Sequence, residues 1–410
     1  MAEFELVIVG GGLASARAIK SYRETGGEGT IALFSKDVDP PYHRPPLSKR
    51  YLRGEAERAD VLVEHEAFYR EHDVELFLDT TVTAVLAGQG EVKVEGGERH
   101  RYGKLLLATG AWPRRLDVPG SDLEGVLTLR TVVDSTEIRR SGAEARTAVV
   151  IGAGFVGMEV AASLRALDVA VTLVHRGRAL FELLQSPEIA RFLEELYRSN
   201  GVTLVLEDEV AEFRGDSRLD AVETAGGRSL QADLAIVGVG VEPVVDFLDG
   251  SGIDVDNGIV VNERFETSAP GVWAAGDVAS FYDPIFDKQR RIEHWSNSNY
   301  QGTEVGKLLA GGEGGYDVVS TFFSEVFGFT FKVFGDPPRG TQALLRGEIE
   351  DGKLLGFYLA DGRLAGAVLA GQEEKTEDRL KELIRERAQV SDEGALRDPH
   401  ASLEEAFAGR

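Results

Sequence analysis

The chain has 410 residues, 43% of them hydrophobic, and its formal net charge is −24. The length suggests two or three domains, and the acidic balance argues against nucleic acid or an anionic membrane surface as a partner, because both are bound through Lys and Arg. Cysteine is absent, which excludes disulfides, thiolate metal ligands and a thiol nucleophile within this chain.

The first predicted elements form a βαβ unit around a glycine-rich turn. An apolar strand at 6–9 leads into the turn, a helix is expected over about 13–22, and a second strand over 30–34. Such a turn directs the amides of a helix N-terminus at a phosphate. A small serine replaces the third glycine of the usual pattern, and Asp37 is the candidate acid for the adenosine ribose. The turn consists of Gly10, Gly11, Gly12, Leu13, Ala14 and Ser15.

The next segments differ in character from this unit. A Pro-rich stretch over 39–46 is too broken for a regular element, whereas 74–78 and 92–94 alternate like antiparallel strands. Residues 104–110 indicate a buried strand that ends in a tight turn.

A second βαβ unit opens near Arg146. Its strand at 148–151 precedes the turn, a helix is expected as far as Leu167, and a strand follows at 169–174. No acid follows that strand to accept a bond from a ribose 2′-hydroxyl, and the basic residues His175 and Arg176 would suit a 2′-phosphate. We therefore expect NADPH, with NADH as the alternative if His175 and Arg176 only cap a surface strand. The turn consists of Gly152, Ala153, Gly154, Phe155, Val156 and Gly157.

The remaining chain predicts shorter elements. A meander of short strands is expected up to 232–238, and a strand over 271–277 ends in a Gly-Asp turn. From about Thr321 short alternating runs rich in Phe indicate a small domain. The fold class is therefore α/β, with two Rossmann-like dinucleotide-binding domains and a small α+β C-terminal domain.

The segment 41–49, PYHRPPLSK, resembles the PYxRPPLSK segment of FAD-dependent ferredoxin reductases of the putidaredoxin and rubredoxin reductase type, which include reductase components of Rieske-type dioxygenases. Later segments are similar to the same family in the same order: 105–111, 129–130, the second glycine turn with Glu159, 237–241, 274–277 and 291–295. The family often carries Trp before a Ser-Asp pair, where this chain has Phe323 and Glu325.

The resemblance implies a glutathione-reductase-like architecture. Residues 1–114 and 245–320 would form the FAD domain, 115–244 the NAD(P) domain, and 321–410 the C-terminal domain. FAD contacts are implied for Gly10, Gly12, Ala14, Ser15, Asp37, Arg44, Lys49, Val82, Ala108, Gly110, Arg130, Gly276, Asp277 and Trp295. Nicotinamide-coenzyme contacts are implied for Gly152, Gly154, Phe155, Val156, Gly157, Glu159, His175, Arg176 and Gly238.

The same resemblance implies that Lys49 and Glu159 meet beside the flavin as the catalytic pair. From the residues alone, Lys49 could equally be a solvated loop cation and Glu159 an acid in the first turn of a helix, where the helix dipole favours it.

The expected activity is hydride uptake from NAD(P)H by FAD and electron delivery to a ferredoxin-type iron–sulfur protein that feeds an oxygenase. The missing cysteine excludes the disulfide reductases and the peroxidases that use a cysteine. The alternatives are an NAD(P)H oxidase or a quinone or dye reductase, and a redox-regulated binding protein like the apoptosis-inducing-factor relatives. The seven histidines lack metal-ligand spacing, so no metal is expected. No leader or membrane-spanning stretch is evident, so we expect a cytoplasmic protein. The oligomeric state stays open between a monomer and a homodimer.

Overall fold

The computed structural model describes residues 2–347, 353–370 and 374–407. The chain divides into two compact units whose segments alternate along the sequence. None of the helices in these described ranges is long and apolar enough to cross a membrane. The first unit contains the chain up to Pro46, Ala56–Trp112 and Val241–Asp317, and the second contains Leu47–Glu55, Pro113–Gly240 and the chain from Val318 onward.

A seven-stranded sheet forms the centre of the first unit, in the order β3-β2-β1-β6-β5-β4. The long strand β6 pairs parallel with β1 along most of its length. Its first residues also pair antiparallel with β5, and its last three, Leu105–Leu107, pair parallel with β18. The central strands are apolar and buried, as a parallel sheet covered on both faces requires. The strands are β1 (Ala2–Val9), β2 (Ile31–Phe34), β3 (Val74–Phe77), β4 (Val82–Leu86), β5 (Glu91–Val94), β6 (Arg99–Leu107) and β18 (Val272–Ala274).

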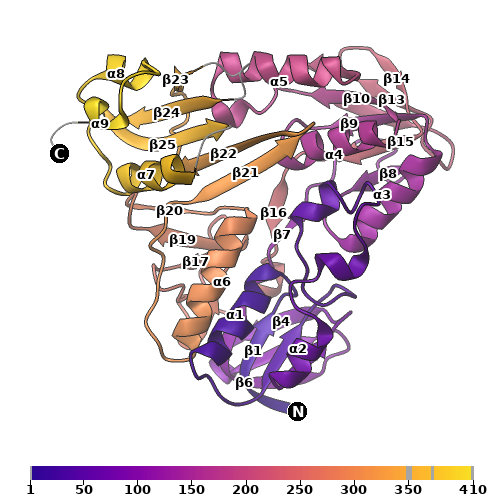
Figure 1. Cartoon of the computed structure of the whole chain (residues 1–410). Coiled ribbons are helices and arrows are strands. Elements are labelled where there is room, and N and C mark those ends of the chain that lie inside the picture. Colours follow the sequence, from indigo (N-terminus) through magenta and orange to yellow (C-terminus); the bar gives the residue numbers. More distant parts are fainter. Residues whose placement is uncertain (1, 348–352, 371–373, 408–410) are drawn as a thin grey trace. The chain divides into compact units, whose positions relative to one another are not determined.

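Two helices far apart in sequence, α1 (Leu13–Glu24) and α6 (Trp295–Leu309), pack side by side in this unit (Figure 1). Gly302 and Gly306 lie one turn apart on α6 and face α1. A methyl group on Gly302 would lie 2.8 Å from Ala14 Cα, and one on Gly306 would lie 2.8 Å from Ser21 Cβ. The two glycines therefore permit an approach that any larger residue would prevent.

Smaller elements complete the first unit. A three-stranded sheet has the order β17-β19-β20, and β7 pairs with β16 where the chain passes between the units. These elements are α2 (Glu66–Glu71), β7 (Ala111–Pro113), β16 (Val241–Pro243), β17 (Ile259–Val261), β19 (Ala279–Asp283) and β20 (Lys288–Arg290), with 3₁₀ turns at Arg58–Val61, Ala87–Gln89 and Asp246–Leu248.

The second unit is built on a five-stranded parallel sheet in the order β11-β10-β9-β15-β8. A three-stranded antiparallel sheet, β12-β13-β14, shares an apolar core with it. The elements are β8 (Val126–Thr128), α3 (Val132–Glu144), β9 (Thr147–Ile151), α4 (Phe155–Ala166), β10 (Ala170–His175), α5 (Pro187–Ser199), β11 (Val202–Leu206), β12 (Val210–Arg214), β13 (Ala221–Thr224), β14 (Ser229–Gln231) and β15 (Leu234–Val237).

The expectation that only short strands follow β10 is wrong for α5. Ser186 caps this helix through a bond to the amide of Ile189, and Pro187 stands at its first position, where the missing amide proton costs nothing. Its apolar residues Ile189, Leu193 and Tyr197 recur at helical spacing and are buried. The signals for a helix were therefore present in the sequence.

A five-stranded antiparallel sheet, in the order β21-β22-β25-β24-β23, fills the C-terminal part of the second unit. Together with its helices it agrees with the expected small domain, and the α/β class with two Rossmann-like sheets is confirmed. The elements are β21 (Thr321–Val326), β22 (Phe329–Gly335), β23 (Leu344–Arg346), β24 (Leu354–Ala360), β25 (Arg363–Ala370), α7 (Glu374–Arg385), α8 (Glu393–Arg397) and α9 (Leu403–Ala406).

Candidate functional site

The first glycine turn leaves the N-terminus of α1 open to a ligand. Gly10 has φ +117°, and a Cβ there would clash with the carbonyl oxygen of Ala108. Gly12 begins the helix without a side-chain cap, and no other described atom lies within 4 Å of where its Cβ would be. The free amides and the helix dipole suit a dinucleotide phosphate. The structure therefore places the predicted residue Ala108 against Gly10, next to the open helix end at Gly12.

The two turns differ at the position of the third glycine of the usual pattern, which is Ser15 in the first turn and Gly157 in the second. In the first turn the Ser15 hydroxyl donates to the Gly10 carbonyl oxygen at 2.5 Å, so the side chain becomes part of the turn. In the second turn a Cβ on Gly157 would clash with the Gly152 carbonyl oxygen. The first turn therefore accommodates a serine at this position, whereas the second requires glycine.

The turn at the end of β18 lies against the start of α1. A Cβ on Gly276 would lie 3.2 Å from Ala14 Cβ, and Asp277 accepts a bond from the Ser298 hydroxyl at 2.9 Å. Gln301 accepts from the amide of Gly276 at 2.7 Å, while its buried Nε2 has no hydrogen-bond partner among the described residues. Buried donors without partners are rare, so this atom fits a site that a polar ligand completes.

Two aromatic contacts order the other predicted FAD residues of the first unit. The Tyr42 hydroxyl donates to Asp37, and the guanidinium of Arg44 lies 5.5 Å from the centre of the Tyr42 ring. Trp295 donates from Nε1 to His43 Nδ1 at 3.0 Å. The Pro-rich segment thereby connects the end of β2 with the start of α6.

Val82 and Gly110 occupy the remaining predicted positions in this unit. Val82 is buried at the start of β4, and Gly110, with φ +71°, forms the turn after β6. Arg130 and Lys49 lie in the second unit. The predicted FAD residues are therefore divided between the two units.

The second glycine turn repeats the open geometry at α4. Gly152 has φ +103°, and a Cβ there would clash with the carbonyl oxygen of Gly238, which places this predicted residue directly at the turn. Gly154 precedes α4 without a side-chain cap, and no described atom lies within 4 Å of where its Cβ would be. Phe155 and Val156 follow, and Val156 is 40% exposed. A second dinucleotide therefore fits at this turn.

Lys49 and Glu159 form a buried ion pair in the second unit. Lys49 Nζ lies 2.6 Å from Glu159 Oε2, and the two side chains are 15% and 7% exposed. The alternative of a solvated Lys49 is wrong, and Glu159 is the fifth residue of α4 rather than a first-turn acid. Two serines add donors to the same carboxylate: Ser48 reaches Oε2 at 2.5 Å and Ser324 reaches Oε1 at 2.8 Å.

Two further serines attach the Lys49 segment to the second unit. Ser135 on α3 donates to the carbonyl oxygen of Leu47 at 2.7 Å, and Ser163 on α4 donates to that of Ser48 at 2.7 Å. These buried bonds fix the backbone immediately before Lys49. Residues 47–55 therefore pack in the second unit, although the sequence-based domains place them within 1–114.

Ser324 was not predicted as a site residue. It is fully buried on β21, which packs against α4 within the second unit. The only signal in the sequence was the Phe-Ser-Glu variation at 323–325. Its hydroxyl makes the C-terminal sheet a direct partner of Glu159.

We expect Ser324→Ala to destabilise the protein by about 1–3 kcal/mol, because it leaves a buried carboxylate oxygen short of a donor. Urea unfolding measures the change. Ser229→Ala is a matched control, since Ser229 donates to Glu223 at 2.6 Å on the exposed surface. Equal losses in the two variants would contradict the importance of burial at Ser324.

The end of β10 carries the residues predicted to select the coenzyme. His175 ends the strand half-buried, and Arg176 follows it exposed. Burial lowers the pKa of His175; Glu182 opposes this shift, and Arg176 adds to it. The imidazole is therefore largely neutral at pH 7. Glu182 is an acid close to the strand end that the sequence prediction missed, because it is seven positions beyond His175.

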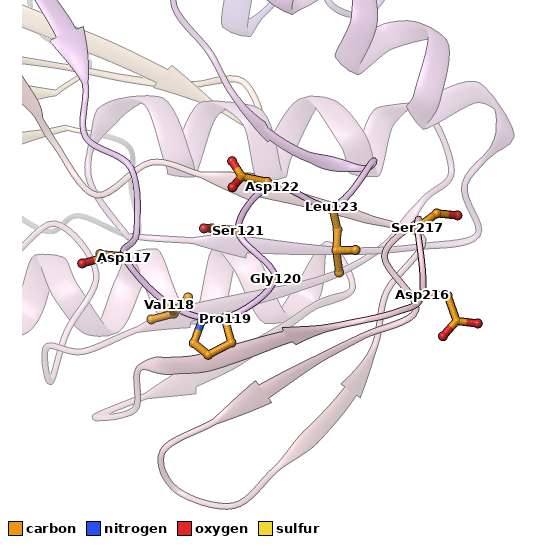
Figure 2. A pocket seen from close by; sticks show the side chains of 9 residues that line it. All are labelled: Asp117, Val118, Pro119, Gly120, Ser121, Asp122, Leu123, Asp216 and Ser217. Carbon is orange, nitrogen blue, oxygen red and sulfur yellow. The ribbon is translucent and has the colours of Figure 1, made fainter.

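A separate surface hollow of about 710 Å³ lies in the second unit (Figure 2). The turn 117–123 and residues 216–217 line it, with three aspartates and no Lys or Arg among these described lining residues. Such a lining disfavours a phosphate. This hollow is therefore not a candidate for a dinucleotide phosphate.

Family models match almost the whole chain. Residues 4–302 match the model described as pyridine nucleotide-disulphide oxidoreductase, and residues 321–407 match the one described as reductase C-terminal. The resemblance seen in the motifs is thereby confirmed.

Individual relatives agree with these models. The ferredoxin reductase component of chlorobenzene dioxygenase from Cupriavidus sp. (strain PS12) is 34% identical over 364 residues, which cover 88% of each chain. The peroxisomal monodehydroascorbate reductase 4 of Arabidopsis thaliana is 33% identical over 389 residues, which cover 90% of this chain and 79% of the relative. The crystal structure of the covalent putidaredoxin reductase–putidaredoxin complex matches with a TM-score of 0.90 and 31% identity over 95% of each chain.

Proposed function

We propose that this chain, which belongs to the pyridine nucleotide-disulphide oxidoreductase family, is an FAD-dependent NAD(P)H:ferredoxin reductase that supplies electrons to an oxygenase. The observation that carries the proposal is the pair of open glycine turns, one in each unit, in a chain without cysteine. Two dinucleotides have a place to bind, and no thiol can receive the electrons. An external acceptor must therefore take them.

FAD, when bound, accepts a hydride from NAD(P)H and releases electrons singly to an iron–sulfur centre. Under the proposal the amides after Gly12 hold its phosphates. Asp37 would meet the adenosine side, and Asp277, fixed by Ser298, would meet the ribityl or phosphate part. The buried Nε2 of Gln301, which has no partner among the described residues, supports a polar ligand beside this turn.

Lys49 and Glu159 would act by electrostatics and position. In the proposal the Lys49 ammonium faces the flavin and stabilises negative charge that develops there, an effect that is strong in a buried setting. Glu159 offsets the cost of burying that ammonium and fixes its direction. The serine hydroxyls hold the carboxylate in place.

For the coenzyme we propose NADPH, with NADH as the alternative. Arg176 and Arg178 are exposed beside the strand end and supply positive charge for a 2′-phosphate. His175 would contribute charge only when it is protonated.

We expect the preference for NADPH over NADH to increase as the pH falls from about 7.5 to 5.5, a range that extends below the ordinary histidine pKa of about 6.5. Burial lowers the pKa of His175 in the free protein. A bound 2′-phosphate would raise that pKa, so its binding takes up a proton and becomes tighter at lower pH. The ratio of the two kcat/KM values across this range measures the effect, and His175→Gln should remove its pH dependence. A ratio that is flat with pH in the unchanged protein would contradict the role of His175.

Steady-state turnover with a purified iron–sulfur ferredoxin, against oxygen alone, tests the proposed activity. We expect electron transfer to the ferredoxin to exceed oxygen reduction by at least tenfold, or about 1.4 kcal/mol in barrier. Because the chain carries a net charge of −24, turnover with an acidic ferredoxin should be measured at several salt concentrations. Oxygen or quinone reduction faster than ferredoxin reduction at every salt concentration would overturn the proposal.

A second candidate is reduction of a small organic acceptor. The likeness to a plant monodehydroascorbate reductase, at 33% identity, favours it. Turnover with a quinone, a dye or an organic radical, in the same assay without ferredoxin, separates this function from the first. A third reading, a redox-regulated binding protein, would require a long-lived reduced state that no acceptor discharges.

A further inference from the structure

Glu182 lies beside the residues that follow β10, at the end of the strand where a dinucleotide fold meets the adenosine ribose. It begins a 3₁₀ turn, Glu182–Leu184, and its side chain is exposed. Its Oε1 accepts from the backbone amide of Arg178 at 2.8 Å. The carboxylate therefore occupies an amide that a bound anion could otherwise use.

The carboxylate and the imidazole flank one point on the chain. A Cβ built on Gly177 would lie 2.5 Å from His175 Nε2 and would also clash with Glu182 Oε1. Both polar atoms thus lie over the α-carbon of Gly177. The carboxylate of Glu182 therefore adds a negative charge at the strand end, where the sequence analysis considered only the basic residues His175 and Arg176.

The backbone around Glu182 is held in an unusual conformation. Phe181 and Gln185, which flank the turn, have φ of +53° and +46°, in the left-handed region that larger residues rarely adopt. Such conformations persist only where the surroundings enforce them. The packing that holds Phe181 and Gln185 in this conformation therefore also fixes the position of Glu182.

The C-terminal sheet supplies part of that enforcement, all within the second unit. The Gln185 side chain donates to the Pro338 carbonyl oxygen at 2.8 Å, and the Tyr358 hydroxyl donates to that of Leu184. The Phe181 ring lies 4.5 Å from that of Phe155 and 5.0 Å from that of Phe331, edge to face in both pairs. One of these partners, Phe155, is the first residue of the coenzyme-binding helix α4.

We propose that Glu182 is a specificity-determining residue that weakens binding of the 2′-phosphate of NADPH while accepting a hydrogen bond from the 2′-hydroxyl of NADH. The inference rests on the proposed function, since it takes the second glycine turn as the coenzyme site. Like charges repel the phosphate, whereas a carboxylate is a good acceptor for a hydroxyl. Glu182 thereby sets a limit on the preference that Arg176 and Arg178 create.

Calorimetric titration of the FAD-loaded protein with 2′,5′-ADP and with 5′-AMP tests this assignment. The variant is Glu182→Gln, which removes the charge and keeps an oxygen that can accept from Arg178. We expect its affinity for 2′,5′-ADP to rise about five- to tenfold relative to that for 5′-AMP, as loss of one nearby exposed charge allows. A ratio of affinities unchanged from that of the unaltered protein would overturn the proposal.

Glu195→Gln is the matched control, because it removes the same charge from an exposed position of the second unit, on α5. A gain in this control equal to that in Glu182→Gln would mean that net charge decides, and would also overturn the proposal. Failure of the proposed NADPH preference gives a different result: the unaltered protein would bind 5′-AMP as tightly as 2′,5′-ADP. Even then, a rise in the ratio of 2′,5′-ADP affinity to 5′-AMP affinity in Glu182→Gln would support the role of Glu182.

Discussion

Lys49→Ala is expected to slow flavin reduction by NAD(P)H about 10- to 100-fold, equivalent to about 1.4–2.7 kcal/mol in barrier, while FAD remains bound. The reason is the loss of the buried ammonium that Glu159 holds at 2.6 Å. Stopped-flow absorbance with NADH and NADPH in parallel measures the rate. An unchanged rate would remove Lys49 from the proposed mechanism.

Stability must be separated from rate in this variant. Removing one partner of a buried pair costs about 3–5 kcal/mol, since the other charge stays buried alone. The double variant Lys49→Met with Glu159→Gln should recover much of that stability and remain slow. Lys307→Ala is the surface control, because Lys307 pairs with Glu304 at 2.6 Å one turn away on α6. A double variant that regained the full rate would show that Lys49 acts only through folding.

Gly302→Ala is expected to lower both FAD content and stability. Its methyl group would lie 2.8 Å from Ala14 Cα and clash with the Ala14 carbonyl oxygen, so α6 must move away from α1. The neighbouring Gln301 then loses its bond to Gly276, which borders the first glycine turn. We expect a destabilisation of about 1–3 kcal/mol, the usual cost of overpacking.

The ratio of flavin to protein absorbance and the thermal midpoint measure the two effects. Gly88→Ala is the matched control, because no described atom lies within 4 Å of where its Cβ would be. That control should keep its flavin and be neutral or slightly stabilising, as alanine restricts the unfolded chain. A Gly302→Ala protein with full flavin content and an unchanged midpoint would contradict the proposed close packing.

The glycine turns and their strands were predictable because their signals are local. Each turn needs a positive φ at its first glycine and open space at the glycine before the helix. Gly10 and Gly12 meet these two needs within a few residues of an apolar strand. The helix α5 was predictable in principle from Ser186 and Pro187, but the short apolar runs on either side of it are typical of strands.

Other parts of the site depend on contacts between distant segments. Ser324 is 165 positions from Glu159, so the bond between them has no local signature. Glu182 is close in sequence to His175, but its direction depends on two residues with left-handed backbones. The family resemblance suggested the Lys49–Glu159 pair, whereas nothing in the sequence indicated that serines on α3, α4 and β21 hold the two sides of it in place.

The attachment of residues 47–55 to the second unit has a consequence for protein engineering. Consider a chimera that exchanges only residues 113–240 for those of a relative, in order to change the coenzyme. It would keep the native segment 47–55 but replace Ser135, Glu159 and Ser163, the residues that hold this segment. A graft that also carries 47–55 preserves those contacts, provided that residue 324 remains serine. The module that can be transplanted is therefore discontinuous in sequence, and its boundaries follow hydrogen bonds rather than the linear order of the domains.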